Sequence, residues 1–373
     1  MSLPRGAWTE IDLGAITRNV RALKALTPPS TRFMAVVKAD GYGHGALRIA
    51  EAALAGGADR LGVATLEEAV ALREAGVTAP LQILAEVPAE GAPFVVRHGI
   101  IATVASGEAA VALSRAAMLA QAQAVCHLKI DTGMNRIGVR AEDAAALGRR
   151  LSDLPGLVFE GAFTHFATAD VPGDWEFDRQ VARLTSAIDA MRTEGVRPAI
   201  VHAANSAATI LHPHTHLDMV RCGIAIYGLP PSEATISKMP LEPAMSVKAR
   251  VSFVKQIGLG DGVSYGLTWH ADGPSTIATL PLGYADGVHR VLSNTMSVLI
   301  GGSRCPQVGR ICMDQLMVRV PAGVAVSSGD EAVLVGAQGA GSITMDEVAG
   351  LAGTINYEMA CGFALRMERI YRA

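Results

Sequence analysis

The chain has 373 residues, which at ~150 residues per domain suits two or three domains. Hydrophobic residues make up 50% of it and charged residues 18%, so a large buried core is feasible. Its 32 basic and 35 acidic residues leave a formal net charge of −3. This balance gives no electrostatic reason to expect nucleic acid or an anionic membrane as a partner.

The N-terminal sequence and the cysteines indicate the compartment. The segment MSLPRGAWTEIDLG has no basic region followed by an apolar run, as a signal peptide would. No apolar run approaches the ~18–20 residues of a transmembrane helix. The five cysteines are odd in number, widely spaced and form no C-x-x-C motif. We therefore expect a cytoplasmic protein that does not bind a membrane.

Short apolar, β-like runs alternate with longer amphipathic segments in the first part of the chain. This alternation indicates parallel βαβ units, and eight strands in succession favour a closed (β/α)8 TIM-type barrel. The alternative is an open, doubly wound sheet. The predicted strands are residues 33–37, 60–64, 81–85, 100–104, 125–130, 158–163, 199–203 and 217–221, and the clearest helical segments are residues 13–26, 66–75, 142–151 and 176–194.

A stretch with four prolines, residues 229–243, separates this region from a different pattern. Beyond it, short alternating or β-branched runs are punctuated by glycine and aspartate, which predicts a mainly β C-terminal domain. We place the barrel at residues 1–235 and the second domain at residues 236–373. The first ~10 residues are a candidate strand of the second domain.

Barrel enzymes carry their chemistry at the C-terminal ends of the strands. Lys38 follows the first apolar run, where burial would lower its pKa and make the amine nucleophilic enough for a Schiff base. The alternative is a lysine whose stem packs while its ammonium reaches water. Residues near or after the ends of later strands add polar candidates, which are Lys129, Arg136, His165, Asn205 and Arg221.

Phosphate binding is expected after the seventh and eighth strands, where barrels commonly bind it through backbone N–H groups. Ser206 lies in NSAAT after the seventh predicted strand, and Gly223 and Ile224 follow the eighth. Glycines 41, 43 and 45, just after Lys38, allow a close approach of the backbone to a ligand.

Nine motifs occur in order along the full chain, and together with these residues they resemble the alanine racemase family, which depends on pyridoxal phosphate (PLP). They are AVVKADGYGHG, KIDTGMNRIGV, FTHFA, NSAAT, VRCGIAIYG, VSYG, PLGYADG, GRICMDQ and TINYE. The resemblance implies a PLP-binding barrel and a β-domain. It also implies a homodimer in which the second domain of each subunit completes the partner's active site. The implied activity interconverts L-alanine and D-alanine, supplying D-alanine for peptidoglycan.

The resemblance also implies the catalytic pair. Lys38 would hold PLP as a Schiff base and act as the base on the D-alanine face, and Tyr265 of VSYG, from the other subunit, would act on the opposite face. Racemisation by two bases needs an acid–base group on each side of a flat carbanion. A free phenol has a pKa of ~10, so a cation must lower it. The expected chain is His165 hydrogen-bonded towards Arg221.

Three basic residues receive supporting roles from the resemblance. Arg221 would face the PLP ring nitrogen, and a guanidinium cannot accept a proton there, which we expect to suppress transamination. The alternative for Arg221 is an ion pair with Asp218. Arg136 would hydrogen-bond the PLP phenolic oxygen and the substrate carboxylate. Lys129 matches a position that is often a carbamylated lysine, and the carbamate would orient Arg136.

The remaining assignments complete the pocket. Met313, from the partner subunit, would touch the substrate carboxylate through its backbone N–H. Its side chain would crowd the substrate methyl group together with Tyr265 and Tyr357, which favours alanine. Tyr284, Cys312 and Asp314 would line the access path. The residues expected to bind the cofactor, most of them at its phosphate, are Tyr42, Asn205, Ser206, Gly223, Ile224 and Tyr357. Asn135 stands where the family often has glycine, which leaves the role of Arg136 intact.

Two other functions are weighed against this one. A PLP decarboxylase of the same plan would need an acidic residue at the ring nitrogen and a glycine-triplet phosphate loop, whereas this chain has Arg221 and no such triplet. A non-catalytic PLP-binding protein would be a barrel alone.

Other patterns are assigned no chemistry. No metal site is expected, because the alternating His212, His214 and His216 surround Pro213 in a predicted surface loop. GAQGAGS, residues 336–342, lacks the Lys-Ser/Thr of a P-loop and is predicted to join two strands. His44 is either a neighbour of the phosphate or polar surface at a helix start.

Overall fold

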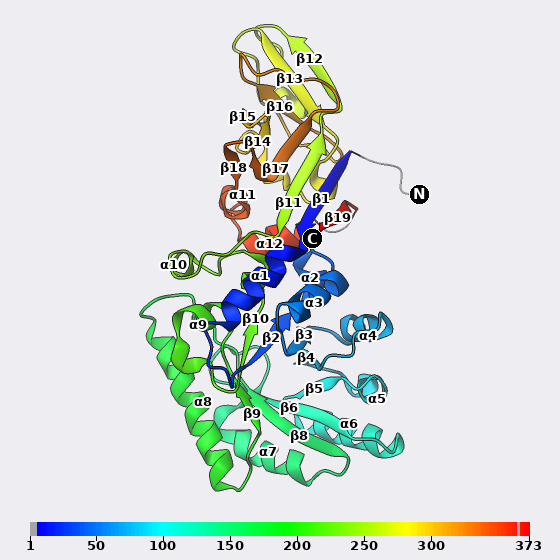
Figure 1. The fold of residues 1–373 in the computed structure, drawn as a ribbon, viewed down its shortest axis with the longest axis vertical. Coiled ribbons are helices and arrows are strands. Elements are labelled where there is room, and N and C mark those ends of the chain that lie inside the picture. Colours follow the sequence, from blue (N-terminus) through cyan, green and yellow to red (C-terminus); the bar gives the residue numbers. More distant parts are fainter. Residues whose placement is uncertain (1–5, 364–365) are drawn as a thin grey trace. The chain divides into compact units, whose positions relative to one another are not determined.

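The computed structural model describes residues 6–363 and 366–373 (Figure 1). The chain divides into two compact units. The barrel unit contains Ala15–Gly41 and Ala46–Glu242, and the β unit contains Tyr42–Gly45, Pro243–Ala373 and the segment that ends at Gly14. Residues 1–5, half of the segment proposed as a strand of the second domain, lie outside the described residues.

Eight parallel strands form a closed ring in the barrel unit. Their order is β5-β4-β3-β2-β10-β9-β8-β6, and β6 pairs back onto β5. This closure confirms the predicted barrel and excludes the open doubly wound sheet. The strands are β2 (Arg32–Val36), β3 (Arg60–Val63), β4 (Leu81–Glu86), β5 (Ile101–Val104), β6 (Ala124–Asp131), β8 (Leu157–Phe163), β9 (Ile200–His202) and β10 (Met219–Cys222), with the short β7 (Val139–Arg140) beside β6.

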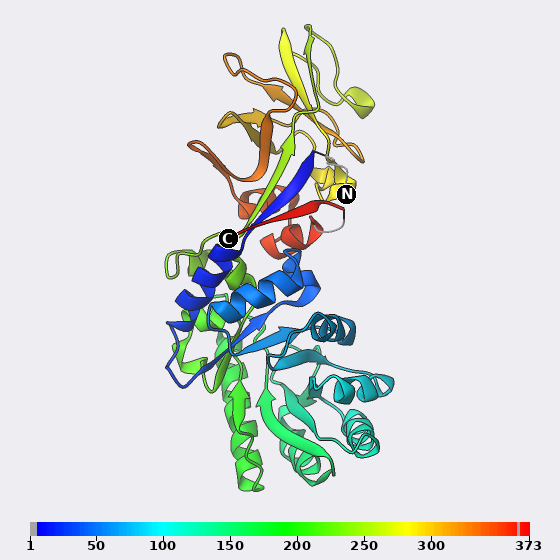
Figure 2. The same cartoon turned by 45° about the vertical axis from the view of Figure 1, so that its right-hand side comes forward.

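Helices cover the outside of the barrel, as the two views agree (Figure 1, Figure 2). Polar side chains start several of them. The Thr65 hydroxyl accepts from the Glu68 backbone N–H, and the Glu68 carboxylate accepts from that of Thr65. In the described part of the chain, no helix is long and apolar enough to cross a membrane. The helices are α1 (Leu13–Lys24), α3 (Ala46–Ala55), α4 (Leu66–Glu74), α5 (Ala92–Arg97), α6 (Gly107–Leu119), α7 (Ala144–Asp153), α8 (Trp175–Thr193), α9 (Ser206–Leu211) and α10 (Glu233–Ile236).

The barrel strands are buried on both faces, which explains why they form nearly continuous apolar runs in the sequence. Fully buried side chains on these strands include Phe33, Leu61, Leu81, Ile83 and Leu128. The strands also carry buried polar side chains, which are Arg60, Gln82, Thr103, His127, Lys129, His202 and Arg221. Buried polar groups are stable only when they are hydrogen-bonded, so this set needs a physical account.

The β unit is mainly β structure, as predicted. One sheet has the order β15-β14-β17-β11-β1-β19 with β18 on β17, and another has the order β12-β13-β16. β1 pairs antiparallel with β11 and parallel with β19, so the N-terminal segment is part of this sheet. The strands are β1 (Ala7–Asp12), β11 (Met245–Arg250), β12 (Phe253–Ile257), β13 (Ser275–Leu280), β14 (Ser297–Ile300), β15 (Ser303–Pro306), β16 (Leu316–Val320), β17 (Glu331–Gln338), β18 (Gly341–Ile343) and β19 (Glu368–Arg372).

Two helices complete the β unit, α11 (Met345–Ala352) and α12 (Asn356–Gly362). The GAQGAGS segment forms the hairpin between β17 and β18, so it joins two strands as expected.

Candidate active site

Lys38 opens a left-handed turn directly after β2. The short element α2 (Lys38–Tyr42) contains Ala39–Gly41, whose φ values are 51°, 51° and 62°. Left-handed backbone costs a residue with a Cβ about 1–2 kcal/mol. The turn is held from both sides: the Ala39 N–H donates to Glu68 Oε1 at 2.6 Å, and Asp40 Oδ1 accepts the first N–H of α3 at 2.9 Å. Such held strain concentrates at functional sites.

Lys38 belongs to a cluster of basic side chains from different strands. Burial, followed by the charges of Arg221, Arg136 and Lys38, lowers the pKa of Lys129 to about 7, against a smaller opposing effect of Asp131. Burial and the same basic groups hold the pKa of His165 well below its ordinary value. The structure therefore brings together five of the residues predicted from the sequence. Their mutual repulsion suits a ligand that carries several negative charges.

Arg221 lies at the centre of this cluster and is almost fully buried. The two protons of its Nη2 are shared among three acceptors, the carbonyls of Thr164 at 2.7 Å and Ala203 at 2.9 Å and His165 Nδ1 at 3.2 Å. Its Nη1 donates to His202 Nδ1 at 3.0 Å. Burial lowers the pKa of Arg221 to about 9, so the group stays charged at neutral pH.

The alternative partner for Arg221 has another role. Asp218 Oδ2 accepts the Val201 backbone N–H at 2.8 Å, which ties β9 to the start of β10. The arrangement of Arg221 is therefore set by histidines and carbonyls and not by a carboxylate.

Lys129 has an unusual environment for an amine. It is 5% exposed, its Nζ donates to the Leu84 carbonyl at 2.9 Å, and it lies 5.1 Å from the centre of the Phe163 ring. One carbonyl and one aromatic face do not neutralise a buried ammonium. The neutral amine is therefore a substantial fraction of this residue near neutral pH.

The predicted phosphate residues of the barrel lie together. Ser206 Oγ accepts the Gly223 N–H at 2.9 Å and the Ala225 N–H at 3.4 Å. This draws the turn that begins at Ile224 onto the start of α9. Asn205 caps α9, its Oδ1 accepting the Ala208 N–H at 3.0 Å. The backbone N–H groups after β10 and the Ser206 hydroxyl are thus gathered at one place.

Two further predicted cofactor residues lie together in the β unit. The rings of Tyr42 and Tyr357 are 6.2 Å apart at an angle of 53°. His44 is fully buried beside them, with Nδ1 2.8 Å from the Tyr42 carbonyl oxygen, so it is not surface. Gly43 is required by packing, because a Cβ there would lie 2.5 Å from the Ala360 carbonyl oxygen. The group that closely approaches Gly43 is therefore the backbone at Ala360 and not a ligand.

Tyr265 is presented on a strained loop of the β unit. The preceding residue, Ser264, has φ 64° and ψ −174°, a region that costs about 1–3 kcal/mol for residues other than glycine. The Ser264 hydroxyl donates to the Arg310 carbonyl at 2.6 Å and lies 3.3 Å from Cys312 Sγ. These bonds join the Tyr265 loop to the loop that carries Met313.

A turn and an ion pair hold the Met313 loop. The Tyr284 N–H donates to the Cys312 carbonyl at 3.0 Å, and the next N–H donates to the Met313 carbonyl at 3.1 Å. Asp314 pairs with Arg366, which also binds the buried Asp286. The structure thus brings Tyr265, Tyr284, Cys312, Met313 and Asp314 together within the β unit. Within this one chain, Tyr265 is 71% exposed and Met313 52% exposed.

Of the three histidines expected in a surface loop, His216 is buried, so the expectation is wrong for that residue. The His212 ring stacks on Phe177 with centroids 4.0 Å apart, and His216 Nε2 lies 2.8 Å from the Thr209 carbonyl oxygen. Across residues 6–363 and 366–373, no group of three His, Cys, Asp or Glu side chains could hold a metal ion.

Sequence reasoning missed several residues that hold the site. Glu68 and Ser264 act through backbone geometry that no motif spacing reveals. His127 and His202 lie inside predicted strands, whereas the chemistry of a barrel is expected at the strand ends. A histidine within an otherwise apolar buried strand was the available signal.

Fold and site together define a class: a (β/α)8-barrel enzyme with a lysine-centred basic site and a mainly β second domain. Residues 11–231 match the family described as alanine racemase, N-terminal domain, and residues 244–371 match alanine racemase, C-terminal domain. The chain belongs to the alanine racemase family, an isomerase family, which confirms the resemblance drawn from the motifs.

Individual relatives extend over the whole chain. An alanine racemase from Symbiobacterium thermophilum is 48% identical, over 98% of this chain and 97% of that protein. The crystal structure of alanine racemase from a D-cycloserine-producing Streptomyces lavendulae has a TM-score of 0.95 and 37% identity, covering 100% of this chain and 98% of that one. A histidine racemase from Leuconostoc mesenteroides has a TM-score of 0.91 and 31% identity, covering 100% and 99%. The fold is thus shared by racemases whose names give different substrates.

Proposed function

We propose that this protein interconverts L-alanine and D-alanine with pyridoxal phosphate as its cofactor. The observation that carries the proposal is the position of Lys38, at the end of the first barrel strand among Lys129, Arg136, His165 and Arg221. The relatives that are 40–48% identical over nearly the full chain are named alanine racemases. D-alanine made here would supply peptidoglycan synthesis.

The residues fit the cofactor in charge and donor type. Lys38 would bind the aldehyde, Arg136 the phenolic oxygen, and Arg221 would face the ring nitrogen. Ser206 gathers the N–H groups of the turn after β10, as a phosphate requires. Tyr42, Asn205, Gly223, Ile224 and Tyr357 would complete the binding residues. When bound, pyridoxal phosphate stabilises negative charge at the substrate Cα.

Two residues would exchange the Cα proton. Lys38 holds it on the D-alanine face and Tyr265 on the L-alanine face, so that removal on one side is followed by return on the other. Arg221 only donates, so neutral His165 accepts on Nδ1 and carries its proton on Nε2. That Nε2–H is the donor that we assign to the Tyr265 phenolate.

Arg221 would also control what happens to the displaced charge. A guanidinium has no lone pair to accept a proton and cannot share one with the ring nitrogen. Facing a bound cofactor, Arg221 would therefore leave that nitrogen unprotonated, and less negative charge would move from Cα into the ring. This favours return of the proton over transamination. The PLP decarboxylase alternative requires a carboxylate in this place.

Lys129 is proposed to react with carbon dioxide. The neutral amine adds to the carbon of CO2 and loses one proton, which leaves a carbamate anion. Because the pKa of Lys129 is about 7 in the folded protein, this residue supplies the neutral amine that the addition needs. The carbamate would orient Arg136. Mass spectrometry of the native protein that finds unmodified Lys129 would count against it.

A homodimer is proposed because Tyr265 and Met313 are exposed within one chain. A carbanion must be shielded from water, so the base beside it has to lie in an enclosed site. A second copy of the chain would enclose Tyr265. A non-catalytic PLP-binding protein would have no use for these two loops.

The five cysteines carry no disulfide, and burial raises the pKa of Cys126 and Cys222 to about 12. Unreactive free thiols suit a protein that works in the reducing cytoplasm.

Alanine is favoured as substrate by the bulk around its methyl group. Tyr265, Tyr357 and Met313 would leave little room there, while Tyr284, Cys312 and Asp314 line the access path. The histidine racemase relative shows that the barrel and β unit alone do not decide this.

The direct test is deuterium wash-in at Cα, measured by NMR on purified protein with L-alanine, D-alanine, serine and lysine in turn. We expect rapid exchange with inversion for both alanine enantiomers and slow exchange for the others. Exchange of alanine without inversion, or faster exchange of lysine, would overturn the proposed function.

A further inference from the structure

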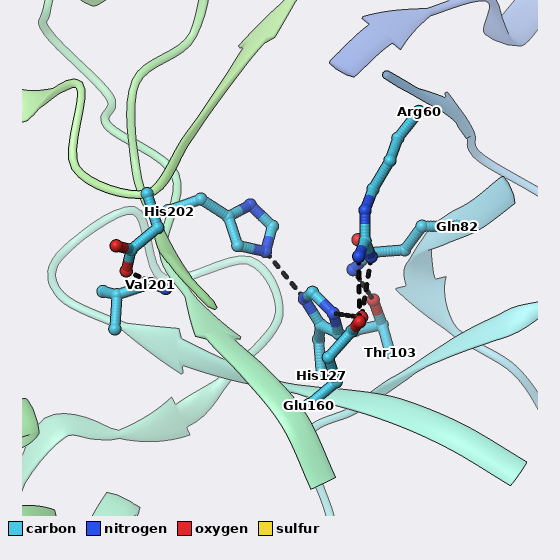
Figure 3. Close-up of polar contacts among 8 residues, drawn as sticks. Arg60, Gln82, Thr103, His127, Glu160, Val201 and His202 are labelled. Atoms are coloured by element: carbon cyan, nitrogen blue, oxygen red, sulfur yellow. Dashed lines mark hydrogen bonds and ion pairs between the residues drawn. The ribbon is translucent and has the colours of Figure 1, made fainter. Parts of the chain in front are cut away.

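A chain of hydrogen bonds crosses the inside of the barrel between His202, His127, Glu160 and Arg60 (Figure 3). His202 Nε2 lies 2.8 Å from His127 Nδ1, and His127 Nε2 lies 2.8 Å from Glu160 Oε2. Arg60 binds both oxygens of Glu160, at 2.7 and 2.8 Å. With the bond from Arg221 to His202, the chain runs without a gap from the active site to the Arg60–Glu160 pair.

The direction of every bond in this chain is fixed by its two ends. Arg221 only donates, so His202 Nδ1 accepts and the His202 proton lies on Nε2. That proton is donated to His127 Nδ1, so the His127 proton lies on its own Nε2. At the far end, the Glu160 carboxylate accepts this proton and the two from Arg60.

Both imidazoles are therefore neutral and in the same tautomer. They are fully buried, and burial is the first cause that lowers the pKa of each. His202 also stacks on Phe163, with ring centroids 4.6 Å apart, which holds its plane. Nothing in barrel packing demands this arrangement, because barrel interiors are ordinarily filled by branched apolar side chains.

We propose that Glu160 and Arg60 are positioning residues of the racemase site, which act through His127 and His202 to keep an acceptor facing Arg221. This rests on the proposed function, which assigns Arg221 to the cofactor ring. The Glu160 carboxylate fixes the proton of His127 on Nε2, and His202 then has to present its bare Nδ1 to the guanidinium. Arg221 is thereby held in one orientation, with Nη2 directed to His165.

Replacement of Glu160 by glutamine removes the fixed acceptor at this end of the chain. Arg60 binds both carboxylate oxygens and His127 shares Oε2 with it, so the amide NH2 opposes a donor of Arg60 in either orientation. With the amide oxygen at the Oε2 position the bond from His127 survives, whereas an NH2 at that position donates to His127 Nε2. In the second orientation His127 carries its proton on Nδ1 and donates to His202 Nε2. His202 must carry its proton on Nδ1, which now faces the N–H of Arg221. Two opposed donors cannot bond, and Arg221 loses its place.

The test is long-range ¹H–¹⁵N NMR on ¹⁵N-histidine-labelled protein, as purified and after removal of the cofactor. It reports which ring nitrogen carries the proton. Wild type is expected to show His127 and His202 protonated on Nε2 alone, and Glu160→Gln is expected to show a second population with both protonated on Nδ1. Glu142→Gln is the matched control, because Glu142 forms an exposed ion pair with Arg140.

Kinetics on the same variants complete the test. Glu160→Gln is expected to lower kcat about 10- to 100-fold per bound cofactor with KM little changed, as loss of an outer hydrogen-bond partner does at other sites. Nδ1 protonation of either histidine in wild type overturns the proposal, even if no variant folds. It is also overturned if Glu160→Gln matches Glu142→Gln in kcat, or changes only the melting temperature. Racemase activity of the wild type is measured separately from the tautomers. A wild type without racemase activity would therefore contradict the proposed function, whatever the tautomers of His127 and His202.

Discussion

Nη2 of Arg221 lies 3.2 Å from Nδ1 of His165, and this bond fixes the proton of neutral His165 on the opposite nitrogen. Because burial and four surrounding basic groups keep the pKa of His165 low, the ring stays neutral under working conditions. The barrel unit thus supplies an oriented N–H donor beside the lysine. This relationship underlies the roles assigned to Lys38 and Tyr265.

Tyr265→Phe tests the two-base assignment. We expect racemisation to fall about 10²- to 10⁴-fold, the range for loss of a general acid–base group, while the absorbance of the bound cofactor is unchanged. Exchange of the Cα proton of D-alanine should be less affected than that of L-alanine, because Lys38 acts on the D-alanine face. Deuterium exchange of each enantiomer measures the difference, and an equal loss for both contradicts the assignment.

Arg221→Glu tests the control of charge at the ring nitrogen. A carboxyl group can share a proton with that nitrogen, so charge would spread into the ring. We expect racemisation to fall about 10²- to 10³-fold and pyruvate formation from alanine to rise relative to it. Arg221→Lys, which retains a positive charge, should not raise pyruvate. If Arg221→Glu leaves the ratio of pyruvate formation to racemisation unchanged, this role of Arg221 is wrong.

Lys129 gives a pH dependence whose sign follows from its lowered pKa. The pKa is about 7 when folded and ~10.4 when unfolded, so between these values the unfolded chain binds the extra proton and stability rises with pH. In CO2-free buffer, Lys129→Met should therefore be more stable than wild type at pH 7, by at most about 5 kcal/mol. The difference should shrink towards pH 10, as measured by urea unfolding. A pH-independent difference is the contrary result.

The left-handed turn predicts opposite effects of one substitution at two places. Ala39→Gly relieves a residue at φ 51° and should raise the free energy of unfolding by about 0.5–1 kcal/mol. Ala182→Gly, at an exposed position within α8, should lower it by about the same amount. Urea denaturation of both variants decides; a loss of stability at residue 39 means that the turn is not strained.

The strained backbone at Ser264 predicts which of two substitutions there costs more racemase activity. Ser264→Ala keeps the strained backbone but removes the bond to Arg310, whereas Ser264→Gly removes the bond and also the strain. We expect the alanine variant to lose more racemase activity than the glycine variant, because the Tyr265 loop leaves its position. Steady-state kinetics test the order, and a reversed order refutes the positioning by strain.

The fold was predictable because barrel strands have a clear pattern. Each predicted strand matches an observed one within two residues, since strands buried on both faces are short apolar runs bounded by polar turns. The motifs around Lys38 and Tyr265 indicated the family, although the spacing of polar residues did not single out Tyr265 among the tyrosines. The compact barrel unit ends at Glu242, within the proline-rich stretch.

The support of the site was not predictable, because it depends on contacts between distant strands. His127 and Glu160 are bonded across 33 positions of sequence, and Arg60 and Glu160 across 100. The positive φ values at Ala39, Asp40 and Ser264 leave no trace in composition either, since residues other than glycine rarely adopt them. Geometry of this kind appears only when the chain is folded.

The proposed racemase activity depends most on the amine that binds the cofactor. Borohydride reduction of the purified protein, followed by digestion and mass spectrometry of the peptides, locates the attachment. We predict a single reduced pyridoxyl group, on Lys38. A group on Lys129, on another lysine, or on none would contradict the account.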